Sequence, residues 1–502
     1  MNYKNPIIRG FYPDPSVCTA NGKYYMVCSS FHYFPGVPLF ESNDLVNWKQ
    51  IGHCLTRKSQ ITLSNIDSSG GVFAPTIRYN NGRFYMTTTN ATIPQHFYVW
   101  TDDIYGEWSD PIPVDQNGID PSLYFEDGHA YFMSNGSDDM GVGGIVQCEI
   151  DIETGKKLSP SQTIWQGTGG RFLESPHLYK INGYYYLMAA EGGTEYGHMV
   201  TYARGDSAFG PFIPYEKNPV LTNRNLGGFE IQGVGHGDLI QAPDGSYWIL
   251  HLGFRQIGKW ATFHHLGREV FISPVFFDSN GWFTAGDMGT TTCDIDIPYL
   301  SVPQKNKNIY TFENTDWNID WCYLRHPDYS KYILSDGGAE LAGCDISLND
   351  IDSPTFIGIR QKEFAGEILC NISIDHGEAG ITLFMDENHH YDIAIRKNDN
   401  YYEVIERLCI GNIKSTESIY KLGSISKANI KIEMDNLEYI FSVQAEDGYH
   451  ILGKGLTRYL SSEVACGFTG VIIGLYAYSD KYSNKAKFTN FRCAYTENKL
   501  SD

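Results

Sequence analysis

The segment NGKYYMV at residues 21–27 combines a tight turn with an aromatic strand, and it decides the fold because it recurs. An Asn-Gly or Asp-Gly pair supplies the positive φ angles of a two-residue type I′ turn, so each copy predicts a hairpin between two antiparallel strands. Five hairpins at intervals of roughly fifty residues indicate an internal repeat. The copies are NGKYYMV (21–27), NGRFYMT (81–87), DGHAYFM (127–133), NGYYYLM (182–188) and DGSYWIL (244–250).

The residues upstream of these turns share a register. Counting eight positions back from each turn glycine leads to the start of an apolar segment, and proline follows in four of the five copies. Five equivalent strand pairs predict a five-bladed β-propeller over residues 1–300, in which equivalent positions form a ring around a central channel. The ring positions are Asp14, Ala74, Asp120, Ser175 and Gly237.

The last two hundred residues follow a different pattern. Residues 293–308, CDIDIPYLSVPQKNKN, are polar and contain two prolines, which is typical of a linker. Beyond them, segments such as residues 379–395 alternate with a period of two and predict a β-sandwich over residues 301–502. The whole chain is therefore expected to be all-β, in agreement with its 35 tyrosines, 27 phenylalanines and 51 glycines.

Charge and cysteine content limit the partners. The net charge of −21 disfavours nucleic acid and anionic membranes and leaves a neutral or cationic ligand. The 11 cysteines are scattered singly, without a CxxC pair or a zinc spacing, so we expect reduced, mostly buried thiols. The first residues lack a signal-peptide pattern and no apolar run is long enough to span a bilayer, so we expect a cytoplasmic protein.

Three carboxylates lie at or beside the ring positions, namely Asp14, Asp120 and Glu174. Acids that meet near a narrow axis cannot all ionise independently, so their pKa values are pushed apart. Glycoside hydrolysis uses such a difference, with one protonated and one ionised carboxyl group. The longer side chain makes Glu174 the expected general acid and Asp14 the general base, while the charge of Asp120 in the preceding blade keeps the pKa of the acid high.

Several longer motifs extend these signals over nearly the whole chain. They are GFYPDPSVC (10–18), FPGVPLFESNDLVNWKQIG (34–52), GGVFAPTIRY (70–79), IDPSLYF (119–125), ESPHLYK (174–180), EGGTEYGH (191–198), GVGHGDLI (233–240), LGREVFISPV (266–275), AGITLFMDENHHYDIAI (379–395) and GFTGVIIGLYA (467–477). Their order and spacing resemble glycoside hydrolase family 43, in particular its β-xylosidase and α-L-arabinofuranosidase members. The last two segments resemble the concanavalin-like jelly roll that follows the propeller in many of those enzymes.

This resemblance implies an inverting mechanism that removes one pentose from a non-reducing end and requires no cofactor. By motif, PDPS makes Asp14 the base, DPSL makes Asp120 the pKa modulator and orienter, and ESPH makes Glu174 the acid. An inverting enzyme needs a gap of roughly 6.5–9.5 Å between base and acid to admit water. Relatives often have glycine where this chain has Ser175, whose hydroxyl is expected to shift the pKa of Glu174.

The resemblance also implies five substrate-binding side chains. Arg268 is expected to contact sugar hydroxyls and to support the carboxylates. His236 lies where the family's histidine helps to hold a calcium ion or a water cluster, so a structural calcium near the axis is one expectation and a core histidine the other. Phe31 matches an aromatic wall, and Phe73 stands where many members have tryptophan. Phe468 matches a residue that reaches from the sandwich into the pocket mouth, so the second domain is expected to close the site.

The expected function is the removal of terminal β-D-xylosyl residues, and also α-L-arabinofuranosyl residues, from short xylo-oligosaccharides. An arabinofuranosidase or arabinanase acting mainly on arabinose-containing oligosaccharides is the alternative, because both sugars present similar hydroxyls. A non-catalytic sugar-binding propeller is a second alternative, although it does not need three acids in register. Each acid alone could instead cap a turn, and the three together could bind calcium. The resemblance further implies a homo-oligomer, a dimer or a tetramer.

Overall fold

The computed structural model describes residues 2–258, 260–480 and 484–496, and the all-β prediction is confirmed for them. The N-terminal part contains five four-stranded sheets, whose neighbouring strands are antiparallel. In chain order these sheets comprise β2 (Ser16–Ala20), β3 (Lys23–Val27), β5 (Gly36–Ser42) and β6 (Lys49–Leu55); β7 (Thr76–Asn80), β8 (Arg83–Asn90), β9 (Gln95–Thr101) and β10 (Ile112–Val114); β11 (Ile119–Glu126), β12 (His129–Ser137), β13 (Gly143–Ile150) and β14 (Gln162–Trp165); β15 (Glu174–Ile181), β16 (Tyr184–Glu191), β17 (Met199–Gly205) and β18 (Ile213–Pro214); β19 (Ile231–Gln241), β20 (Tyr247–Arg255), β21 (Glu269–Phe277) and β22 (Phe283–Ala285).

The first strands of these sheets form a closed ring. In the order β2, β7, β11, β15 and β19 each strand lies beside the next, and β19 lies beside β2. Between each pair of neighbouring sheets the apolar side chains form one buried cluster. Burial of these side chains holds the sheets face to face, because apolar area removed from water stabilises by about 25 cal/mol per Å². The start of every first strand is therefore near one axis.

The predicted hairpins are present in all five sheets, but one turn differs from the prediction. Asn21, Asn81, Asp127 and Asn182 have positive φ, as does the glycine after each, so these four turns have the backbone expected of type I′. The fifth connection is longer, because β19 ends at Gln241 and β20 begins at Tyr247. The predicted two-residue turn at residues 244–245 was therefore wrong, and the fifth repeat does not share the register of the other four.

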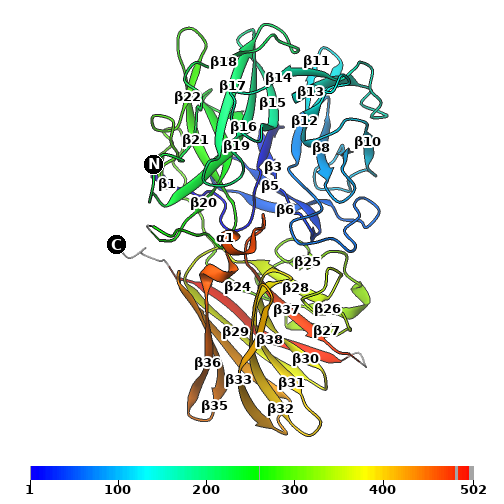
Figure 1. Ribbon diagram of the computed structural model, residues 1–502, viewed down its shortest axis with the longest axis vertical. Helices are drawn as coiled ribbons and strands as arrows, with labels where there is room; N and C mark the ends of the chain where they lie inside the picture. The colour runs from blue at the N-terminus through cyan, green and yellow to red at the C-terminus, as the bar shows by residue number, and fades with distance from the viewer. Residues whose placement is uncertain (1, 259, 481–483, 497–502) are drawn as a thin grey trace.

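Two sheets form the C-terminal part, which Figure 1 shows below the ring. Their facing sides share one large apolar core, as a sandwich requires. The larger sheet contains β26 (Tyr332–Ser335), β27 (Gly338–Ala342), β38 (Lys485–Tyr495), β29 (Gly366–Ile374), β34 (Lys427–Met434), β35 (Glu438–Ala445) and β36 (Gly448–Leu456), with β24 (Ile309–Thr311) beside β38; the smaller contains β28 (Thr355–Arg360), β37 (Ile472–Tyr478), β30 (Glu378–Asp386), β31 (His389–Lys397), β32 (Tyr402–Ile410) and β33 (Ile413–Gly423).

The short elements lie mostly where the two parts meet. The strand β4 (Tyr33–Phe34) pairs with β25 (Tyr323–Leu324), so one ladder joins the two parts of the chain. The helical turns are η1 (Tyr329–Lys331), η2 (Thr457–Leu460) and α1 (Ser462–Ala465), and Figure 1 shows α1 at the junction. The predicted linker contains β23 (Asp294–Asp296), which pairs with β1 (Asn2–Lys4) and ties it to the start of the chain.

The core between the two parts is continuous. Phe11, Phe31 and Tyr33 of the first part pack in one buried cluster with Leu324 and Phe356 of the second. All 11 cysteines are free and eight of them are buried, which confirms the predicted reduced thiols. Among the described residues, no helix has the length and apolar character needed to cross a membrane.

Candidate active site

The three predicted carboxylates line one small cavity at the ring. Asp14, Asp120 and Glu174 come from the first, third and fourth sheets, and all three border a space of about 80 Å³. All five predicted substrate-binding residues border the same cavity. They are Phe31, Phe73, His236, Arg268 and Phe468. The structure therefore brings every predicted site residue together, although these side chains are scattered over 455 positions of the chain.

A left-handed backbone places the ring residues. Asp14, Asp120, Ser175 and His236 have φ values of 56°, 53°, 56° and 49°, which side chains other than glycine rarely adopt. The pairing of β11, β15 and β19 shifts register beside the last three of these residues, as at a β-bulge. Such strained positions gather at functional sites, where the surrounding sheets hold them. In the fifth sheet the strained residue is His236 and not Gly237, because the longer turn displaces the count by one.

Asp14 is surrounded by groups that favour its ionised form. Ser29 Oγ donates to Asp14 Oδ2 at 2.5 Å, and Arg268 Nη1 donates to Oδ1 at 2.8 Å. His236 Nδ1 lies 3.6 Å from the same Oδ1. Burial alone would raise the pKa of Asp14, but Arg268, His236 and Ser29 outweigh burial and hold the pKa below its ordinary value. Asp14 is therefore ionised at neutral pH, as a general base must be.

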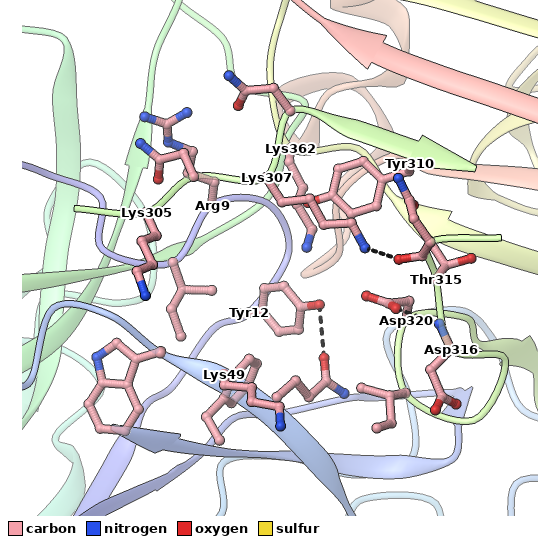
Figure 2. Close-up of a pocket in the computed structure, with 18 of the residues that line it drawn as sticks. Arg9, Tyr12, Lys49, Lys305, Lys307, Tyr310, Thr315, Asp316, Asp320 and Lys362 are labelled. Carbon is pink, nitrogen blue, oxygen red and sulfur yellow. Dashed lines mark hydrogen bonds between the residues drawn. The ribbon is translucent and has the colours of Figure 1, made fainter. Parts of the chain in front are cut away.

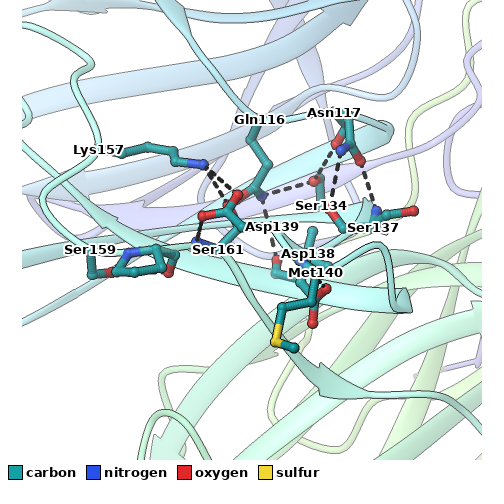
Figure 3. A network of polar contacts seen from close by, with 12 residues as sticks. Gln116, Asn117, Ser134, Ser137, Asp138, Asp139, Met140, Lys157, Ser159 and Ser161 are labelled. Carbon is teal, nitrogen blue, oxygen red and sulfur yellow. Dashed lines mark hydrogen bonds and ion pairs between the residues drawn. The ribbon is translucent and has the colours of Figure 1, made fainter.

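A polar network fixes the chain that leads to Asp120. Figure 3 shows Gln116 and Asn117, just before β11, in contact with side chains of the neighbouring strands and loops. Gln116 Nε2 donates to Ser134 Oγ at 2.9 Å, and Ser134 Oγ donates to the Asn117 carbonyl at 3.0 Å. Ser161 Oγ donates to Gln116 Oε1 at 2.9 Å. These bonds fix the position of the residues just before β11, and so they help to position the strained backbone at Asp120.

The other two carboxyls have raised pKa values. Burial raises the pKa of Glu174 to about 7, and the charge of Asp14 contributes, while Arg268 lowers it. Burial raises the pKa of Asp120 well above its ordinary value, with contributions from Glu174 and then Asp14. Asp120 and Glu174 thus titrate as a pair. The prediction assigned the charge that raises the pKa of Glu174 to Asp120, but that charge is the one on Asp14, which also raises the pKa of Asp120. The cavity holds one ionised carboxylate and a pair of carboxyls that retain a proton.

Arg268 lies at the centre of the cavity's polar contacts. Besides Asp14, its Nη1 donates to Thr194 Oγ1 at 2.8 Å, and its Nη2 donates to the Phe468 carbonyl at 3.2 Å. Its guanidinium carbon lies 5.7 Å from the ring centres of both Phe31 and Phe468. The arginine is almost completely buried, so its position is fixed by these contacts. The neighbouring acid, Glu269, does not pair with Arg268 but with Arg255.

Three phenylalanines form the apolar wall. Phe31 and Phe468 stack with ring centres 5.8 Å apart and planes 22° apart, and Phe73 lies 5.6 Å from Phe31. Phe468 comes from the C-terminal part and remains 41% exposed. Its backbone N–H donates to Ser69 Oγ at 2.8 Å, and this bond anchors Phe468 to a loop of the first part. Apolar ring faces of this kind stack on the C–H groups of sugars.

The residues around His236 do not fit a calcium site. Calcium takes six to eight oxygen ligands, and in the described part of the chain no group of three or more His, Cys, Asp or Glu side chains is arranged to hold a metal ion. The carboxylate next to His236 belongs to Asp14, which is already bonded to Arg268. Burial lowers the pKa of His236, so the ring is neutral and acts as a polar wall.

Two contacts of the site were not predicted. Ser29 and Thr194 bond to Asp14 and Arg268, respectively, yet hydroxyl side chains are common and carry no signal of their own. Thr194 lies within the motif EGGTEYGH, and Ser29 lies five residues before the motif that begins at Phe34. The hydroxyl of Ser175 is buried and has no hydrogen-bond partner among the described residues, so the expected side-chain bond near Glu174 is not formed. The Ser175 backbone N–H donates instead to Asp120.

Comparison with known proteins agrees with this geometry. Residues 3–283 match the family described as Glycosyl hydrolases family 43, and residues 310–494 match the beta xylosidase C-terminal concanavalin A-like domain. The chain is 36% identical to a non-reducing end α-L-arabinofuranosidase of Bacteroides ovatus, over 98% of this chain and 95% of that protein. It is 35% identical to a xylosidase/arabinosidase of Butyrivibrio fibrisolvens, over 97% and 98%.

A solved structure gives the same picture in three dimensions. The chain superposes on a xylan β-1,4-xylosidase of Bacillus halodurans with a TM-score of 0.89 and 27% identity, covering 98% of this chain and all of that one. The similarity therefore includes both the ring of sheets and the C-terminal sandwich.

Proposed function

Because the chain belongs to glycosyl hydrolase family 43, we propose that this glycosidase is an inverting exo-enzyme that removes terminal pentose residues from short oligosaccharides. One observation carries the proposal. A single cavity combines an ionised carboxylate, Asp14, with a carboxyl group, Glu174, whose pKa of about 7 keeps it partly protonated at neutral pH. This is the difference in proton affinity that glycoside hydrolysis needs.

In the proposed reaction each carboxyl group has one task. Asp14 takes a proton from a water molecule, and the water oxygen forms a bond to the anomeric carbon. The bond from that carbon to the leaving oxygen breaks, and Glu174 gives its proton to that oxygen. The charge of Asp14 raises the pKa of Glu174, and Asp120, which titrates as a pair with Glu174, orients the sugar. Arg268 keeps Asp14 ionised through the 2.8 Å bond and binds sugar hydroxyls with its remaining N–H groups.

The shape of the cavity supports exo action. Its volume of about 80 Å³ suits one small sugar unit and not a polymer that passes through. Phe468 covers one side of the entrance, and its contact with Ser69 joins the C-terminal part to the ring. We propose that the second domain, residues 301–502, closes the site in this way, and that the five sheets of residues 1–300 are the five blades of a β-propeller.

The identity of the pentose has two candidates. The first is a terminal β-D-xylosyl residue, with α-L-arabinofuranosyl as a second substrate, in line with the xylosidase and xylosidase/arabinosidase names of relatives. The alternative is a preference for α-L-arabinofuranosyl residues. It is favoured by the 36% identity to an enzyme named as a non-reducing end α-L-arabinofuranosidase.

One experiment tests sugar and stereochemistry together. The full chain is given an aryl β-D-xyloside and an aryl α-L-arabinofuranoside, and proton NMR follows the first anomer released. The proposal expects hydrolysis of at least one substrate with the anomer opposite to that of the substrate. Release of the same anomer would contradict inversion. Hydrolysis of neither aryl glycoside would contradict the proposal that the enzyme removes a pentose. A cytoplasmic location, a dimer or tetramer, and independence from cofactors stay predictions.

A further inference from the structure

The chain contains a second, larger cavity between its two parts. It has a volume of about 660 Å³, and none of its lining residues borders the carboxylate cavity. Its walls come from residues 7–12 and 48–50 of the first part, residues 305–310 of the connection and residues 313–320 and 362–363 of the second part. Figure 2 shows it in close-up. Nothing in the proposed hydrolysis uses this space.

Basic side chains gather around this cavity in an otherwise acidic protein. The chain has 38 basic and 59 acidic residues, yet five basic side chains line this one space against four acidic ones. They are Arg9, Lys49, Lys305, Lys307 and Lys362. Among the described residues, no carboxylate lies within ion-pair distance of any of the four lysines, whereas eight lysines elsewhere are paired. None of the four lysine charges is therefore neutralised by an ion pair, although Lys307 Nζ donates to the Asn314 carbonyl at 2.5 Å.

The four acidic residues of the lining have other partners, and the first of them, Glu313, bonds to Thr311. Glu363 accepts from two arginines, Arg9 and Arg255. Asp320 Oδ2 accepts from the backbone N–H of Asp316 at 2.8 Å, and Asp316 Oδ1 accepts from a backbone N–H of the same turn, also at 2.8 Å. These carboxylates maintain local structure and none forms an ion pair with the lysines, although the charge of Asp320 acts to raise the pKa of both Lys307 and Lys362.

Two of the lysines are held close together around one ring. Lys307 Nζ lies 4.8 Å and Lys362 Nζ 4.9 Å from the ring centre of Tyr310, so the two ammonium groups are less than about 10 Å apart. Lys362 also lies 5.7 Å from the ring of Tyr12. Figure 2 shows Lys307 and Lys362 grouped with Tyr310. Desolvation lowers the pKa of Lys307 and the charge of Lys362 lowers it further, although Asp320 opposes them. An anion between the two ammonium groups would relieve this repulsion.

The rest of the lining suits the hydroxyl groups of a sugar. Gln50, Asn306 and Asn308 supply amide donors and acceptors, and the half-buried indole of Trp48 supplies an apolar face. We propose that this cavity binds an anionic sugar, with its carboxylate or phosphate between Lys307 and Lys362 and its hydroxyls toward the amides. The site is a binding site separate from the one that carries out hydrolysis.

Calorimetric titration of the full chain tests the proposal with three probes. Glucuronate and glucose 6-phosphate carry the two anionic groups, and glucose is the neutral control. We expect at least one anionic sugar to bind and glucose to bind about tenfold more weakly or not at all, because charge-assisted hydrogen bonds are the strong ones. The anionic sugar that binds better identifies the group. Affinity should fall as the sodium chloride concentration rises.

Substitutions locate the binding. The double variant Lys307→Gln/Lys362→Gln should weaken binding about tenfold or more, and the exposed pair Lys305→Gln/Lys307→Gln provides a second test where folding is not at risk. Lys421→Gln is the matched control, since Lys421 lies 5.2 Å from the Tyr401 ring centre, far from the cavity. Glu174→Gln should leave binding unchanged and so separates this site from hydrolysis. Equal binding of glucose, no binding of either anion, or full binding by both double variants would overturn the proposal.

Discussion

Arg268 donates a 2.8 Å hydrogen bond to Asp14 across 254 positions of the chain, and so joins the last sheet of the ring to the first. The guanidinium lowers the pKa of Asp14 and also opposes the rise in the pKa of Asp120 and Glu174. One cation therefore acts to lower the pKa of all three carboxyl groups.

Replacement of Arg268 by Met should move the pH profile of activity to higher pH. Loss of the positive charge raises the pKa of Asp14, so the acidic limb of kcat/KM moves up by roughly 1–3 pH units, the usual effect of a neighbouring arginine on an aspartate. The basic limb moves in the same direction because Arg268 also lowers the pKa of Glu174. Initial rates from pH 3 to 10 measure both limbs. Arg492→Met, which removes an arginine of the sandwich that pairs with Glu367, serves as control. If the rate falls while both limbs of the pH profile stay in place, Arg268 contributes only to substrate binding.

The unmodified enzyme should lose activity as the pH rises through about 7. The pKa of Glu174 is about 7, so above that pH the proton needed by the leaving oxygen is absent. Asp14, with its lowered pKa, remains ionised until far more acidic pH and sets the other limb. The pH dependence of kcat/KM with a disaccharide substrate reports both groups. Activity that stays level up to pH 9 would contradict the assignment of Glu174 as the acid.

Replacement of Glu174 by Gln should affect substrates according to their leaving group. With a xylobiose-like substrate, whose leaving alcohol must be protonated, kcat/KM should fall by about 10²–10⁴. With a nitrophenyl glycoside the loss should be much smaller, since nitrophenolate leaves without a proton. Glu216→Gln, an exposed change outside the cavity, is the matched control. Equal losses on both substrates would indicate damage to the site and not the loss of an acid.

The same variant should be more stable than the unmodified protein at alkaline pH. A carboxyl group whose pKa is raised from 4.5 to about 7 on folding binds its proton more tightly in the folded state, so folding stability is lost as the pH rises from 4.5 through 7. Gln cannot ionise and escapes this loss. We expect Glu174→Gln to gain about 3 kcal/mol at pH 8 and little at pH 4.5, by urea unfolding at both pH values. A gain that does not depend on pH would refute the raised pKa.

Replacement of Phe468 by Ala should open the cavity. The ring stacks on Phe31 and covers part of the entrance, so its loss removes one apolar wall of the sugar pocket. We expect KM for short substrates to rise about tenfold, with a smaller change in kcat, because an aromatic contact is worth about 1 kcal/mol beyond the area it buries. Tyr459→Ala is a matched control, since Tyr459 is exposed to a similar degree (38% against 41%). An unchanged KM would remove Phe468 from the binding site.

Much of the fold could be predicted because its signals are local. An Asn-Gly or Asp-Gly pair between aromatic strands specifies a hairpin from two adjacent residues, and four of the five turns agree. Counting back from those turns also located Asp14, Asp120 and Ser175, since the number of residues in the hairpin is constant. The count failed at His236, where a longer connection adds a residue that no local signal marked.

The remaining features depend on distant contacts. Phe31, Arg268 and Phe468 entered the prediction only through family resemblance, because nothing near them in sequence says that they face one cavity. The bonds of Ser29 and Thr194 likewise depend on the closure of the ring. The lysine-lined cavity could not be predicted, since it exists only where the first part, the connection and the second part of the chain meet.

The shared core at the junction has a practical consequence for anyone who wishes to shorten this enzyme. Phe11, Phe31 and Tyr33 are covered by the C-terminal part, and β4 finds its partner there. A truncation after the ring would leave these rings and an unpaired strand edge open to solvent, a combination that favours aggregation. A minimal version of the catalyst therefore needs polar replacements on that face before its second half is removed.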